Sequence, residues 1–95
     1  ILLIPYCDTI IMNSSQKKSL LALFKHPVQS NLEWRRIESL FEAVGAQRIE
    51  GDGSRVRFVL NGMLASFHRP HPNKEAKPYQ IRDARDFLLQ AGILP

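Results

Sequence analysis

The side chains best suited to chemistry in this chain are those of His68 and Arg55. Imidazole can accept or donate a proton near neutral pH, and guanidinium stays positively charged. Side by side, they would form a metal-free site for phosphodiester chemistry. The imidazole can take the proton of a ribose 2′-hydroxyl, and the guanidinium can stabilise the charge that develops on the phosphate. Taken alone, a strand histidine such as His68 is more often an ordinary surface residue than a catalyst.

A predicted β-hairpin brings these two side chains together. Residues 55–60 read Arg, Val, Arg, Phe, Val, Leu, and Asn61-Gly62 follows at once, which favours a two-residue type I′ turn. The face that includes the candidate site then carries three opposed pairs: Arg55 with His68, Arg57 with Ser66, and Val59 with Leu64. The other face is apolar throughout and is expected to lie against helices. It carries Val56, Phe58, Leu60, Met63, Ala65 and Phe67.

Helices and one further strand are predicted around the hairpin. A first helix is expected over 14–25, capped by Ser14 or Ser15, and a second over 31–44, with Ser30 and Glu33 as a capping box and Gly45 after it. A strand is expected over 46–50. A last helix is expected over 78–91, with Pro78 in its first turn and Gly92 after its end. This order predicts an α+β fold. Its three-stranded antiparallel sheet is covered on one face by the helices at 31–44 and 78–91, and the helix at 14–25 is an addition.

Composition indicates one small domain: 95 residues, 44% of them apolar, with 13 Lys plus Arg against 9 Asp plus Glu and a net charge of +4. A single cysteine, Cys7, cannot form an intramolecular disulfide, and the three histidines are scattered. We therefore expect a reducing compartment and neither a metal nor a cofactor. Pro5 and Asp8 interrupt the apolar N-terminal residues, which are too few for a membrane span. A cytoplasmic protein without membrane contact is predicted.

Positive charge gathers around the hairpin. Residues 46–77 contain three acidic residues and six basic ones: Arg48, Arg55, Arg57, Arg69, Lys74 and Lys77. This pattern has two explanations, an ordinary solvated strand face or a surface that contacts nucleic-acid phosphates. The sequence has no glycine-rich phosphate loop, nucleophile elbow or paired carboxylates, so nucleotide triphosphate, esterase and glycosidase chemistry have no support.

The segment from Pro70 to Ile93 carries a family resemblance. It contains Pro-His-Pro-x-Lys-Glu, then Lys-Pro, then a helix that ends in Gln-Ala-Gly-Ile, and Gly53-Ser54 precedes it in the chain. Over about residues 31–93 the sequence resembles the HicA family of toxin ribonucleases. That resemblance implies a fold like a double-stranded-RNA-binding domain and a small toxin of a type II toxin–antitoxin module. It also implies an enzyme that cleaves mRNA to arrest translation and that a HicB-type antitoxin neutralises.

One position departs from the family pattern. The family's catalytic histidine directly follows Gly-Ser, and here that position is Arg55. Two explanations stay open. Either His68 supplies the imidazole from the neighbouring strand, or the chain has lost cleavage and is an RNA-binding or antitoxin-docking module. We favour the first slightly, because the predicted register places His68 opposite Arg55.

The expected site follows from these considerations. His68 is the general base or acid, and Arg55 stabilises the phosphate. The expected RNA contacts are Ser54, Arg57, Arg69, Lys74 and Lys77, with His71 of the Pro-His-Pro motif as a reserve candidate.

We divide the chain into a tail and accessory helix at 1–30 and a toxin domain at 31–95. The accessory helix could cover the sheet edge, contact the antitoxin or enlarge the core.

Overall fold

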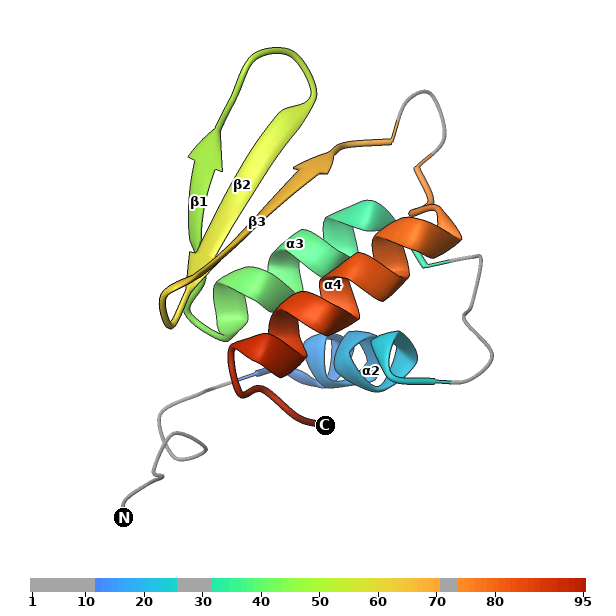
Figure 1. Cartoon of the computed structure of the whole chain (residues 1–95). Coiled ribbons are helices and arrows are strands. Elements are labelled where there is room, and N and C mark those ends of the chain that lie inside the picture. Colours follow the sequence, from blue (N-terminus) through green and yellow to red (C-terminus); the bar gives the residue numbers. More distant parts are fainter. Residues whose placement is uncertain (1–11, 26–31, 71–73) are drawn as a thin grey trace.

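The computed structural model describes residues 12–25, 32–70 and 74–95. These residues form three helices and three strands: α2 (Ser14–Leu23), α3 (Trp34–Ala43), β1 (Gln47–Glu50), β2 (Arg55–Leu60), β3 (Met63–His68) and α4 (Pro78–Gln90). The strands make one antiparallel sheet in the order β1-β2-β3. In Figure 1, α3 and α4 cover one face of this sheet, and α2 packs on them from the side away from the strands. The predicted α+β fold is confirmed.

The hairpin between β2 and β3 has the predicted turn and register. Asn61 and Gly62 both have positive φ, 52° and 82°, as a type I′ turn requires. Asn61 pays little for this conformation because asparagine tolerates the left-handed region better than most residues. The paired residues run from Leu60 with Met63 to Arg55 with His68. A two-residue turn thus fixes which side chains share each face of the sheet.

The inward face of the hairpin supplies the strand half of the core. Val56, Phe58 and Phe67 are buried. The ring centroid of Phe41 in α3 lies 4.8 Å from that of Phe58 and 5.2 Å from that of Phe87 in α4. Both pairs are edge-to-face, an arrangement that aromatic rings favour. The sheet and the two covering helices are therefore held by one aromatic cluster, and the opposite face of the sheet stays open.

Helix α2 adds to this core and does not cover the sheet edge. Leu20 and Leu23 are buried and belong to the same apolar cluster as the residues of α3 and α4. Its N-cap is Asn13, whose side chain accepts a 2.8 Å hydrogen bond from the Gln16 backbone, while the Gln16 side chain accepts one of 3.0 Å from the Asn13 backbone. The prediction of Ser14 or Ser15 as the cap was wrong, because Asn13 forms the reciprocal pair with Gln16.

Helix α3 begins later than predicted. Its N-cap is Glu33, with no side-chain cap, so the predicted capping box of Ser30 and Glu33 was wrong; Ser30 itself lies outside the described residues. The reason is a backbone bridge to a distant segment. Trp34 donates to the Lys74 carbonyl at 2.9 Å, and Ala76 donates to the Leu32 carbonyl at 2.8 Å. This pairing holds the chain extended up to Glu33, so the helix starts at Trp34.

Helix α4 has the predicted ends. Pro78 is its first residue, where a missing backbone N–H costs nothing. Gly92 follows the C-cap with φ of 87°, a conformation suited to glycine at a helix end. Across the three described stretches, no helix has the length and apolar character needed to cross a membrane.

Candidate nucleic-acid interface

The open face of the sheet carries the candidate chemistry. Arg55 and His68 are cross-strand partners at one end of the hairpin, and both are exposed to solvent. Arg57 is two residues further along β2, on the same face. It pairs with Ser66 of β3 on one side and with Ile49 of β1 on the other. Val56 and Phe58, which alternate with the two arginines along β2, are buried, so these exposed side chains lie on the opposite face of the sheet, which α3 and α4 leave uncovered (Figure 1). The predicted juxtaposition of an arginine and a histidine on an exposed strand face is therefore present.

The turn before β2 positions Arg55. Gly51 donates to the Arg55 carbonyl at 3.0 Å, and the Arg55 amide donates to the Asp52 carbonyl at 3.1 Å. A Cβ on Gly51 would lie 3.1 Å from the Cβ of Arg55, closer than such atoms normally approach. Gly53 has φ of +60°, which glycine adopts at no steric cost. Two glycines thus let the chain fold tightly against the first residue of β2.

Ser54 extends the same register by one step. Its carbonyl accepts a 2.8 Å hydrogen bond from the Arg69 amide, so the two chains stay paired one residue beyond Arg55 and His68. Ser54 is exposed. Ser54 therefore adjoins Arg55 in the backbone pairing, at the end of the hairpin where the chain leaves toward α4.

A buried glutamine, Gln80, fixes the end of β3 to the start of α4. Its Nε2 donates to the His68 carbonyl at 2.6 Å, and its Oε1 accepts from the Lys77 amide at 3.0 Å. Gln80 is 2% exposed, and both ends of its amide are satisfied, as buried polar groups require. Gln80 was not among the residues predicted from the sequence. The available signal was its place three residues after the N-cap of α4, where a glutamine commonly bonds back to the cap.

Arg69 is held by two carboxylates. Its Nε lies 2.7 Å from Oε2 of Glu38 on α3, and its Nη1 lies 2.8 Å from Oε1 of Glu50 on β1. The hydrogen bond from Arg69 holds the pKa of Glu50 below its ordinary value, and the bonds to Glu50 and Glu38 raise the pKa of Arg69. Arg69 therefore links α3, β1 and the end of β3, and its charge is already compensated, which argues against a phosphate contact.

Arg48 belongs to the same network. It lies 2.9 Å from the carboxylate of Glu42 and 3.4 Å from those of Glu38 and Glu50. Glu38 also accepts a hydrogen bond from the indole of Trp34. The sequence analysis missed Glu38, because nothing in the order of residues shows that one carboxylate of α3 meets two arginines of the sheet. Of the six basic residues around the hairpin, two are thus neutralised locally.

The remaining basic residues form two groups. Within the described residues, no ion pair engages Arg55 or Arg57 on the sheet, or Lys74 and Lys77 beyond β3; all four are exposed. Lys77 is the N-cap of α4 and is tied to His68 through Gln80. His71 lies between these groups in the sequence, outside the described residues.

The order helix, three antiparallel strands, helix from α3 to α4, with both helices on one face of the sheet, is the α+β arrangement of double-stranded-RNA-binding domains. The family model of the HicA toxin of bacterial toxin–antitoxin systems matches residues 34–93, more than half of the chain. The chain therefore belongs to the HicA toxin family, as the sequence motifs indicated. Comparison with curated proteins and with solved structures found no significant match. The match begins at the first residue of α3, so α2 lies outside it.

Proposed function

We propose that this chain is an endoribonuclease toxin that cleaves mRNA in the cytoplasm and is neutralised by a HicB-type antitoxin. The observation that carries the proposal is the cross-strand pair of Arg55 and His68, exposed on the open sheet face of a HicA-family fold. His68 accepts the proton of a ribose 2′-hydroxyl, whose oxygen bonds to phosphorus. The bond between phosphorus and the 5′-oxygen then breaks, the departing oxygen takes the proton that His68 accepted, and Arg55 stabilises the charge on the phosphate between these steps.

The neighbouring cations and hydroxyl complete the proposed site. Arg57 lies one row from the pair on the same face, where it can bind the adjacent phosphate, and Ser54 can orient the reacting one. We assign the RNA backbone beyond β3 to Lys74 and Lys77, which are exposed, and keep His71 as the reserve for proton transfer. We leave Arg69 out of the RNA contacts because Glu38 and Glu50 engage its guanidinium.

Cleavage of a defined RNA in the presence of chelator tests the proposal. The His68→Ala variant should lose about 100-fold or more in rate, the usual range for a general acid or base. Arg55→Ala should lose a comparable factor through the unstabilised phosphate charge. Arg82→Ala is a matched control, since Arg82 is an exposed arginine of α4 without an ion pair among the described residues. Unchanged cleavage by His68→Ala would remove His68 from the mechanism.

A second function is favoured by the arginine that replaces the family's catalytic histidine. In this alternative, the chain binds RNA or the antitoxin without cutting RNA. The Arg55→His variant separates the two proposals. If His68 is the catalytic imidazole, Arg55→His removes the phosphate-stabilising cation and cleavage falls. If the chain is inactive, the wild type binds RNA without cutting it, and Arg55→His is the change that would introduce cleavage.

A further inference from the structure

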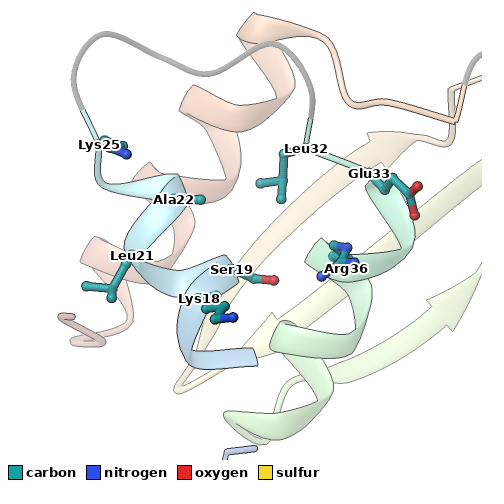
Figure 2. Close-up of a pocket in the computed structure, with 8 residues that line it drawn as sticks. All are labelled: Lys18, Ser19, Leu21, Ala22, Lys25, Leu32, Glu33 and Arg36. Carbon is teal, nitrogen blue, oxygen red and sulfur yellow. The ribbon is translucent and has the colours of Figure 1, made fainter. Parts of the chain in front are cut away.

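Helices α2 and α3 form a pocket that lies outside the proposed RNA site. It has a volume of about 750 Å³ and runs between the exposed side of α2 and the start of α3. Figure 2 shows Lys18 and Leu21 on α2, Lys25 just after its end, and Arg36 on α3. The family match covers residues 34–93, so all of the lining residues except Arg36 lie outside the matched segment.

The pocket has apolar walls. Leu21 is 60% exposed although its neighbours on α2, Leu20 and Leu23, are buried. Ala22 and the buried Leu32 continue the apolar lining. No aromatic side chain among the described residues lines the pocket. An exposed leucine beside such a hollow can bury an incoming apolar side chain, but it gives no surface on which a nucleic-acid base could stack.

The rim of the pocket is positively charged. Lys18, Lys25 and Arg36 make no ion pair within the described residues, although Arg36 donates a 3.2 Å hydrogen bond to the hydroxyl of Ser15. Glu33 is the one carboxylate among the described lining residues, and Arg35 holds it at 2.7 Å. That bond keeps the pKa of Glu33 below its ordinary value. The three cations are therefore available to carboxylates from outside.

We infer that this pocket docks an acidic segment of the antitoxin, with one apolar side chain between Leu21 and Leu32 and flanking carboxylates on Lys18, Lys25 and Arg36. Family membership implies an antitoxin partner in general, and an acidic segment complements this rim in charge. Because α2 packs on the side of α3 and α4 away from the sheet (Figure 1), the segment would not compete with RNA. The naming of the partner as an antitoxin rests on the proposed function.

A second attachment point has a defined consequence. Once the acidic segment is docked, the rest of the antitoxin is held near the open sheet face at a raised effective concentration. Occlusion of the RNA site then persists even when its own contacts with the antitoxin are individually weak. Loss of the pocket should therefore be visible as faster dissociation of the whole complex.

The test compares variants of the full chain against the purified product of the adjacent gene, with the dissociation constant as readout. The double variant Lys18→Glu/Lys25→Glu should weaken the complex by about tenfold or more through charge repulsion. Leu21→Ser should also weaken it through the lost apolar contact. Lys17→Glu and Leu89→Ser are the matched controls, because both residues are exposed and lie outside the pocket. These controls should stay within about twofold of the wild type.

Two further readouts keep the outcome unambiguous. Melting temperatures of all variants should match the wild type, since every changed side chain is exposed. RNA cleavage without antitoxin should be unchanged in the pocket variants, whereas His68→Ala should bind the antitoxin normally, so the two proposals fail separately. Equal affinity of pocket and control variants, absence of a complex with the wild type, or a loss of RNA affinity in Lys18→Glu/Lys25→Glu would each overturn the assignment.

Discussion

The role of each arginine in this chain is decided by the carboxylates around it. Arg57 and Arg69 come from the same hairpin segment of the sequence, yet Arg57 projects from the open sheet face, while Arg69 is held between Glu38 and Glu50. A charge that already has two partners gains little from a phosphate, because one favourable contact would replace another. A free guanidinium on the same surface gains the full interaction.

This difference predicts opposite consequences for two alanine variants. Arg57→Ala should weaken RNA binding, with little effect on folding. The slope of log affinity against log salt concentration should become shallower by about one, the value for one lost phosphate contact. Arg69→Ala should leave the salt slope unchanged and reduce the free energy of unfolding by about 1–2 kcal/mol, through lost charge-assisted hydrogen bonds. RNA titrations at several salt concentrations, combined with urea unfolding, measure both quantities. A lower salt slope in Arg69→Ala would return Arg69 to the RNA-binding set.

Acid should weaken the same network. The hydrogen bond from Arg69 holds the pKa of Glu50 below its ordinary value of 4.5, so the stability that Glu50 contributes is present above that value and is lost as the pH falls through the lower folded-state pKa. We expect Glu50→Gln to melt below the wild type at neutral pH and the gap to close in acid. Melting temperatures from about pH 7 to about pH 3 measure this. Asp52→Asn, without an ion pair among the described residues, is the control and should show no such closing gap.

At the scale of elements, local signals were sufficient where the chain folds on itself. The Asn61-Gly62 turn and the alternation of residues 55–60 before it predicted the β2–β3 register, and hence the Arg55 and His68 pair. Pro78 and Gly92 predicted both ends of α4. These features depend on residues a few positions apart, so the sequence contains what determines them.

Local signals failed where distant segments meet. The start of α3 depends on backbone hydrogen bonds to Lys74 and Ala76, some forty positions along the chain, and no residue near Ser30 indicates them. The partners of Arg69 are likewise on other elements. The candidate cations were therefore predicted as a group, but which of them are neutralised could be known only from the packing of α3 against the sheet.

The turn at Asn61-Gly62 sets the hairpin register, and the pairing of Arg55 with His68 depends on that register. Gly62 has φ of +82°, so Gly62→Ala forces a side chain into a strained backbone conformation and should cost about 1 kcal/mol of stability. If the register also slips, Arg55 and His68 no longer share a face, because a shift of one residue reverses every side chain. Thermal unfolding and RNA cleavage together check this. Ser66→Ala, an exposed change in the same hairpin, should leave the melting temperature near that of the wild type.

At the scale of the whole molecule, three layers lie on top of one another: the sheet, then α3 with α4, then α2 (Figure 1). Among the described residues, the open sheet face and the pocket between α2 and α3 both carry exposed cations, and they lie on opposite sides of the middle layer. Under the two proposals above, this separation would let RNA and a tethered acidic segment bind independently. It also means that α2 must be part of the folded unit if its pocket is to hold a fixed shape.

The division of the chain at residue 30 can be tested through that requirement. Leu23 is fully buried in the core shared by α2, α3 and α4, so Leu23→Ala should reduce the free energy of unfolding by about 2–5 kcal/mol. Leu21→Ala, at an exposed position on the same helix, should cost far less. If α2 folds as one unit with the toxin segment, the helical signal and the Trp34 fluorescence of Leu23→Ala shift together in urea. A Trp34 transition that stays at the wild-type midpoint while helical signal is lost earlier would show instead that residues 1–30 form a separable unit, as the predicted division implies.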